Sequence, residues 1–244
     1  MVAEQPLFPG GTAVSGLSVY PWTAADGIRG GSPHVHLACT EAYVVVAGTG
    51  AVQTLTMAGF KETPLFEGAV VWFSPGTIHR AVNEDGSLRV VVVMQNSGLP
   101  EAGDAVFTFP PHVLADPEVY HRNAALTESS DGAARARRDL AMRGFLQLAQ
   151  QVRAGDTEPL ADFYRAAVAL KREHVAAWEQ IWRDGPAEAV RRTDEHLSTL
   201  RAGDIDHLLR ADVRSAAPPP ERAYGMCGRL DTYSLRPGPA LDAP

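Results

Sequence analysis

Four residues in the first third of the chain have the types and spacing of a metal site. His34 and His36 flank one valine in "SPHVHL", Glu41 follows five residues after His36, and His79 comes directly after "SPGTI". Residues two apart on a strand point to the same face, so the first two imidazoles would project together. Imidazole and carboxylate ligands suit divalent transition metals. Such a set would leave one or two positions of a six-coordinate ion open, as a catalytic site requires.

Short β-strands must position these side chains. Val, Thr and aromatic residues are frequent in the first 110 residues, and Gly, Pro, Asn or Asp clusters separate the apolar runs. Asp85-Gly86 suits the positive φ angles of a tight hairpin. The expected strands are 16–22, 32–38, 41–48, 50–57, 68–74, 77–82 and 87–95. This pattern predicts a sandwich or a small barrel.

The remainder of the chain has a helical pattern. Apolar residues recur every three or four positions in 157–184, and we expect His174 to be a hydrogen-bonded core residue on that stripe. Gly185-Pro186 is expected to end this helix. Further helices are predicted over 131–155, 186–203 and, shorter, 204–215. A final strand returning to the β half is expected at 224–235.

The candidate ligands lie in two stretches that resemble the two sequence motifs of the cupin superfamily. The first motif is matched by His34, His36, Glu41 and Gly48, and the second by Gly68, Pro75-Gly76, His79 and Asn83. Ile28 and Ser74 stand where the pattern has glycine and proline, both at turns. The resemblance covers residues 30–83, and the β pattern extends it to about 1–98.

The resemblance implies a mainly β fold. It implies a double-stranded β-helix (jelly-roll) barrel, here over residues 1–110, followed by an α-helical region over 111–244. The metal ligands that it implies are His34, His36, Glu41 and His79. Cupins commonly dimerise, so a homodimer is expected. The helical region is expected to pack on the barrel and either narrow its mouth or build the dimer interface.

Other residues are candidates for the neighbourhood of the metal. Tyr43 is in phase with Glu41 and is our candidate catalytic residue, although a plain core role fits it equally well. Gln53 and Trp72 could also line the pocket. Arg80 alternates away from His79, which predicts an outward side chain available for a subunit contact.

Composition excludes several classes of function. The chain has 244 residues and a net charge of −7, which argues against nucleic acid as the main partner. No apolar run approaches the about 20 residues of a membrane helix, and no export signal precedes the first strands. The two cysteines, Cys39 and Cys227, are therefore expected to be reduced thiols, and a cytoplasmic location is favoured.

Three functions are compatible with these residues, because a cupin barrel does not determine its reaction. The preferred one is a dioxygenase that uses Fe(II) and O₂ on a small oxygenated molecule; Mn, Ni, Zn, Cu or Co would also suit the ligands. The second is a sugar- or carbonyl-isomerase or epimerase that uses the metal as a Lewis acid. Against the isomerase, residues 1–100 contain few basic residues that could bind a substrate phosphate, namely Arg29, Lys61, Arg80 and Arg89. The third is a metal- or ligand-binding barrel without catalysis.

Overall fold

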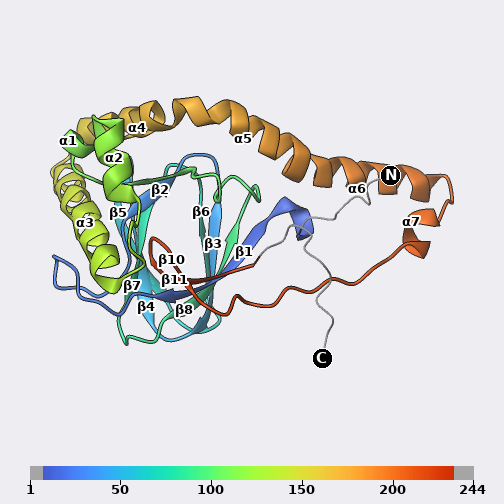
Figure 1. Ribbon diagram of the computed structural model, residues 1–244, viewed down its shortest axis with the longest axis horizontal. Coiled ribbons are helices and arrows are strands. Elements are labelled where there is room, and N and C mark those ends of the chain that lie inside the picture. The colour runs from blue at the N-terminus through green and yellow to red at the C-terminus, as the bar shows by residue number, and fades with distance from the viewer. Residues whose placement is uncertain (1–7, 234–244) are drawn as a thin grey trace.

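Two antiparallel sheets face each other in the computed structural model, which describes residues 8–233 (Figure 1). The first sheet has the strand order β10-β11-β1-β8-β3-β6 and the second β5-β4-β7-β2-β9. The strands are β1 (Ala13–Val19), β2 (His34–His36), β3 (Glu41–Ala47), β4 (Gly50–Thr56), β5 (Gly59–Leu65), β6 (Val70–Phe73), β7 (Ile78–Asn83), β8 (Arg89–Met94), β9 (Ala105–Phe107), β10 (Ala223–Tyr224) and β11 (Gly228–Thr232). The arrangement is the expected double-stranded β-helix, or jelly-roll, barrel with a helical C-terminal region.

Alternation along the strands fills the space between the sheets. In β3, Tyr43 and Val45 are buried, while Val44 between them is partly exposed. Val90 and Val92 of β8 pair with them in register and are also buried. Each strand of this sheet therefore has one apolar face in the barrel and one outside it.

The helical region follows β9. It contains α1 (Pro111–Leu114), α2 (Pro117–Ala124), α3 (Asp131–Arg153), α4 (Glu158–Lys171), α5 (Val175–Trp182), α6 (Glu188–Arg201) and α7 (Asp206–Leu209). The η turns between α4 and α6 are η2 (Arg172–His174) and η3 (Arg183–Ala187), and η1 (Pro9–Gly11) precedes β1. None of the described helices combines the length and the apolar character needed to cross a membrane.

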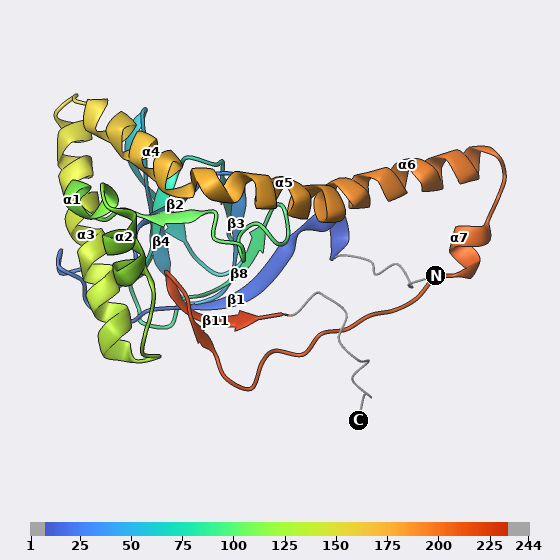
Figure 2. The ribbon, with the colours of Figure 1, turned by 45° about the horizontal axis from the view of Figure 1, so that its top comes forward.

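Helix α3 covers the outer face of the five-stranded sheet (Figures 1 and 2). Arg80 of β7 points outward as expected, but it is fully buried beneath α3, where its guanidinium contacts the Met142 sulfur and pairs with Asp26 at 3.0 Å. The expected subunit contact at Arg80 is therefore wrong, because a helix of the same chain occupies that face. Gln53 pairs in register with Arg80 and shares this outer face, so it does not line the barrel interior.

Helices α4, α5 and α6 follow one another in a nearly continuous rod (Figure 2). The expected stop at Gly185-Pro186 is wrong, because the chain passes through a π-helical turn, η3, and continues as α6. A π turn shifts the hydrogen-bond ladder locally and so tolerates a proline without an N–H. His174 is also exposed rather than in the core, since η2 interrupts the helix there.

The chain returns to the barrel at its C-terminal end. β11 pairs antiparallel with β1, from Ser15↔Thr232 to Val19↔Gly228, and β10 pairs with β11. This hairpin lies in the segment where a returning strand was expected, although residues 234 and 235 of that segment fall outside the described residues. The first sheet is thus built partly from residues that follow the helices.

Candidate metal centre

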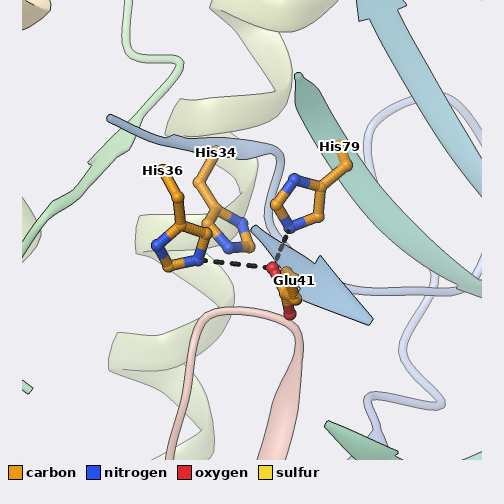
Figure 3. A group of neighbouring side chains, drawn as sticks. All are labelled: His34, His36, Glu41 and His79. Atoms are coloured by element: carbon orange, nitrogen blue, oxygen red, sulfur yellow. Dashed lines mark ion pairs between the residues drawn. The ribbon is translucent and has the colours of Figure 1, made fainter. Parts of the chain in front are cut away.

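Three imidazoles come together from two paired strands (Figure 3). His34 and His36 lie on β2, and His79 lies on β7. His34 and His79 are directly opposite each other in the antiparallel pairing, so their side chains share the inner face. Their ring centroids are 4.2 Å apart. The two-residue spacing brings His36 to the same side of β2.

Glu41 reaches the three imidazoles from the opposite sheet, at the start of β3. Its Oε2 lies 3.0 Å from Nε2 of His79 and 3.4 Å from Nε2 of His36. Each of the four residues offers one ligand atom, and these four atoms all lie within 4.8 Å of one another. All four side chains are buried, with exposed fractions from 0% for His79 to 7% for His36. The structure therefore brings together every residue that the sequence singled out as a ligand.

Local backbone geometry fixes two of the rings. Nδ1 of His34 lies 3.0 Å from the carbonyl oxygen of Ser32, and Nδ1 of His79 lies 3.0 Å from that of Thr77. A carbonyl oxygen only accepts, so each Nδ1 must carry the hydrogen and donate it. In a neutral ring, Nε2 then has a free lone pair directed at the centre of the group.

A buried carboxylate fixes the third ring. Nδ1 of His36 donates to Oδ1 of Asp104 at 2.7 Å. This arrangement, in which a carboxylate orients an imidazole through its distal nitrogen, is typical of metal-binding histidines and raises the basicity of the ligating nitrogen. All three Nε2 atoms are thus free to bind the same ion.

The atoms at the centre fit a bound cation. Nε2 of a neutral His79 and Oε2 of an ionised Glu41 are both acceptors, and neither atom has a hydrogen-bond partner among the described residues. Two buried lone pairs facing each other at 3.0 Å repel unless a cation or a proton lies between them. The set of three imidazole nitrogens and one carboxylate could bind a divalent transition metal.

In the metal-free site, the pKa values of His34, His36 and Glu41 are set by burial and by the contacts of these residues with one another and with their charged neighbours. Burial and the neighbouring His79 and His36 hold the pKa of His34 well below its usual value. Burial also lowers the pKa of His36, but the hydrogen bond to Asp104 and the nearby Glu41 outweigh it, and the net pKa is raised. Burial raises the pKa of Glu41, yet His79 and His36 outweigh it and the net pKa is lowered. Glu41 is therefore an anion in the metal-free protein.

Tyr43 lies beside this group. Its side chain is fully buried, its ring centroid is 6.3 Å from that of His79, and its hydroxyl has no hydrogen-bond partner among the described residues. Burial, together with the neighbouring Glu41 and Cys227, raises its pKa well above the usual value, so the hydroxyl stays protonated. Phe73 adds an aromatic wall, with its ring centroid 4.2 Å from that of His79.

Trp72 does not line the site. Its side chain is 70% exposed, because Trp72 and Phe73 are consecutive residues of β6 and Phe73 is the one that points inward. The expectation that Trp72 lines the pocket was therefore wrong, because its neighbour Phe73 is the residue on the inner face of β6. A strand pattern with apolar residues on both faces, such as "VVWF", does not reveal which face is inside.

Three residues that support the site were not found in the sequence. Asp104 precedes the short strand β9, Cys227 lies in the turn between β10 and β11, and Tyr164 lies on α4. The Cys227 sulfur is 4.0 Å from Nδ1 of His34, and burial raises the pKa of its thiol to about 12. The one available signal was an acidic residue directly before an apolar run, "GDAVF".

The helical region helps to position the ligands. The Tyr164 hydroxyl donates to the carbonyl of Gly76 at 2.7 Å, and the Gly76 N–H donates to the carbonyl of His36. Farther along, the indole of Trp178 in α5 donates to the carbonyl of Ala102, two residues before Asp104. The helices thus hold the turn before His79 and the loop before Asp104.

Comparisons with known proteins give fold likenesses only. No protein-family model matches the chain, and no curated protein matches it. Among solved structures, an uncharacterised conserved protein with a double-stranded β-helix domain from Klebsiella pneumoniae is 19% identical, with a TM-score of 0.30, covering 40% of this chain and 74% of that one. The barrel has the cupin fold. Its two facing antiparallel sheets, and the convergence of the His and Glu side chains of β2, β3 and β7, are what the resemblance implied.

Two further similar structures carry names. KdgF from a Halomonas species is 22% identical, with a TM-score of 0.25, covering 28% of this chain and 57% of that one. QdtA, a sugar 3,4-ketoisomerase from Thermoanaerobacterium thermosaccharolyticum, is 11% identical, with a TM-score of 0.29, covering 32% of this chain and 57% of that one. The match thus spans less than two thirds of either protein. These likenesses concern the cupin barrel and say nothing of its reaction.

A separate hollow lies away from the candidate metal centre. It has a volume of about 690 Å³ and lies between α1, α3 and α4, with Phe109, Leu148 and Phe163 in its lining. It contains none of the four candidate ligands. Access to those ligands is instead expected from the side of His36 and Glu41, the two most exposed of the four.

Proposed function

We propose that the cupin barrel is a metal-dependent enzyme that oxidises a small oxygenated molecule with O₂, with His34, His36, Glu41 and His79 as the ligands of Fe(II). The observation that carries this proposal is the convergence of three Nε2 atoms and one carboxylate oxygen within 4.8 Å, each imidazole being held through Nδ1. Bound Fe(II) would supply electrons to O₂ and open coordination positions to the substrate.

The protein's own residues have distinct roles in this proposal. Asp104, Ser32 and Thr77 orient the three rings through Nδ1. Phe73 and the other buried neighbours exclude water from the reacting atoms. The Tyr43 hydroxyl, which has no hydrogen-bond partner among the described residues, would donate a hydrogen bond to a substrate oxygen.

The charge of the site favours a neutral or singly anionic substrate without phosphate. The carboxylates of Glu41 and Asp104 lie within it, while Arg80 points away beneath α3 and Arg29 donates to the carbonyl of Glu84. A phosphorylated sugar would need cationic partners for its phosphate. This disfavours an isomerase acting on nucleotide or phosphate sugars.

A carbonyl isomerase remains the second candidate, favoured by the unpartnered Tyr43 hydroxyl. Because this hydroxyl stays protonated, it could donate its proton to the carbonyl oxygen of a hydroxycarbonyl substrate, while a separate base removes the proton from the adjacent carbon. Tyr43→Phe separates the two functions: an isomerase that uses the hydroxyl as its acid would lose on the order of 100-fold or more in rate. A dioxygenase that uses the hydroxyl only to position the substrate would lose less rate, and the substitution would mainly raise its KM.

Metal content and O₂ consumption test the proposal directly. Protein purified without oxygen should contain about one iron per chain or take it up on reconstitution, and His36→Ala with His79→Ala should abolish this binding. Oxygen uptake with a panel of small diketones, thiols and hydroxyacids should require the metal. Metal loading without O₂ consumption by any of these, together with isomerisation of a hydroxycarbonyl compound, would overturn the oxidative reaction and leave the metal site intact.

A further inference from the structure

Helix α6 has no covering partner in the described chain. It contributes no buried residue, and Val190, Leu197 and Leu200 are 71%, 56% and 50% exposed. In both views α6 and α7 project beyond the barrel, and α7 adds the exposed Leu208 and Leu209 (Figures 1 and 2). We call residues 188–209 the arm. An apolar surface of this kind on a well-formed helix indicates an interaction site.

The apolar face of the arm continues a face that is covered nearer the barrel. Trp178 of α5 is buried and bonded to Ala102, and Pro186 is buried against Gly11. Beyond this contact the rod leaves the barrel. Val190, Leu197 and Leu200 are seven and three residues apart, a spacing that places them on one side of the helix.

The barrel exposes a second apolar surface. The outward residues of β3, β6 and β8 are aliphatic or aromatic apart from Arg89 at the end of β8, and Trp72 and Val70 are 70% and 53% exposed. We call this surface the sheet patch; it consists of Val44, Val46, Val70, Trp72, Val91 and Val93. Helix α3 covers the equivalent outer face of the other sheet, but no described helix lies on this one (Figure 1).

The arm and the sheet patch match in size. The 14 residues of α6 give a helix of about 21 Å. The three strands that carry the patch, β8, β3 and β6, span about 10 Å between the outer strand axes. One α6 can therefore cross the whole patch. It does not do so within its own chain, because it points away from the barrel (Figures 1 and 2).

We propose that two copies of the chain form a dimer by exchanging arms, with α6 of each copy packed on the sheet patch of the other. Two-fold symmetry makes the contact twice, so each copy contributes both surfaces. Typical monomers expose a largest apolar patch of about 300–600 Å², and a stable interface buries about 800 Å² on each partner. Arm and patch together expose Trp72 and seven aliphatic side chains by 46% to 74% each. At roughly 100 Å² a side chain, this is an apolar area on the order of 800 Å². This dimer is independent of the metal chemistry proposed above.

Charge substitutions on each surface test the exchange. By sedimentation or light scattering at micromolar concentrations the full chain should be a dimer. Leu197→Glu on the arm and Trp72→Glu on the patch should each raise the dissociation constant by about 100-fold or more, because each places a charge in an apolar contact. The control Ser198→Glu adds the same charge beside the stripe on α6 and should remain dimeric. Circular dichroism and metal binding verify that all variants are folded.

Cross-linking identifies which surfaces meet. Both native cysteines are buried, so introduced thiols can be oxidised selectively. The double variant with Trp72→Cys and Leu197→Cys should form a covalent dimer on mild oxidation, whereas each single variant should not. A full chain that is monomeric at tens of micromolar, a dimer insensitive to both charge substitutions, or efficient cross-linking of Leu197→Cys alone, which would mean arm against arm, overturns the exchange.

Discussion

The Asp104 carboxylate accepts a hydrogen bond of 2.7 Å from Nδ1 of His36, across 68 residues of sequence. Asp104 is fully buried, and its second oxygen has no hydrogen-bond partner among the described residues. So short a contact orients the His36 ring and increases the electron density on Nε2, the atom that faces Glu41 and His79. Asp104 thus supports the candidate metal centre through His36, although it is not one of the four candidate ligands.

Replacing Asp104 should weaken metal binding without removing a ligand. Asp104→Asn keeps an oxygen that can accept from Nδ1 but loses the charge, and we expect an affinity loss of about 10-fold. Asp104→Leu removes the acceptor, and the loss should approach about 100-fold. Titration against a competing chelator measures both. Glu67→Gln, at an exposed turn, is the control, and equal affinities in all four proteins would contradict a role for Asp104.

Metal binding should stabilise the fold. At a free metal concentration of 100 to 1,000 times Kd, the free energy of unfolding should rise by about 3–4 kcal/mol. Thermal unfolding with and without added metal measures this rise. The His79→Ala protein should show little of it, while His121→Ala, which removes an exposed imidazole on α2, should respond as the unchanged chain does. An equal response in His79→Ala would place the metal elsewhere.

Local spacing was sufficient to predict that the four candidate ligands converge, but not which residues support them. His34, His36, Glu41 and His79 lie in two short stretches whose strand period and turn residues determine their direction. Asp104 and Cys227 reach the site only through the pairing of β9 with β2 and of β11 with β1. Such contacts depend on the tertiary fold, because an acidic residue before an apolar run, as at Asp104, does not reveal which strand that run will pair with.

The errors in the prediction have the same origin. A Gly-Pro pair usually ends a helix. Here Pro186 packs against Gly11, and a π turn accommodates the proline, which has no N–H to donate. Strand β5, "GFKETPL", was missed because its Lys, Glu and Pro residues are unfavourable in strands, and it is tolerated at the edge of a sheet. In both cases tertiary packing outweighs the local preference.

The affinity for metal should fall as the pH is lowered, through His36. In the metal-free protein the pKa of His36 is raised, because Asp104 and Glu41 outweigh the effect of burial, so a proton on Nε2 competes with the ion. Below that pKa the affinity should drop by about tenfold per pH unit. Asp104→Asn should move the onset of this fall to lower pH. An onset that does not move would assign the proton to another group.

The same proton affects the stability of the metal-free protein. His36 binds its proton more tightly in the folded state than in the unfolded state. Its contribution is therefore complete below the unfolded pKa of about 6.5 and is lost as the pH rises through the raised folded value. Denaturant unfolding across this range, with and without bound metal, should show the loss only in the metal-free protein, since the metal occupies Nε2.

The docking of α3 on the barrel depends on Gly144. A Cβ at this position would collide with the backbone carbonyl of Thr108, directly after β9, where the Thr108 hydroxyl also donates to the carbonyl of Ala141. Gly144→Ala should therefore lower the free energy of unfolding by about 1–3 kcal/mol, although alanine favours helix formation. Gly132→Ala, in the first turn of the same helix with no atom closer than 3.9 Å, should be neutral or stabilising by up to about 1 kcal/mol. If Gly144→Ala were as stable as Gly132→Ala in denaturant titrations, the close contact between α3 and the barrel would be refuted, and with it the burial of Arg80 beneath that helix.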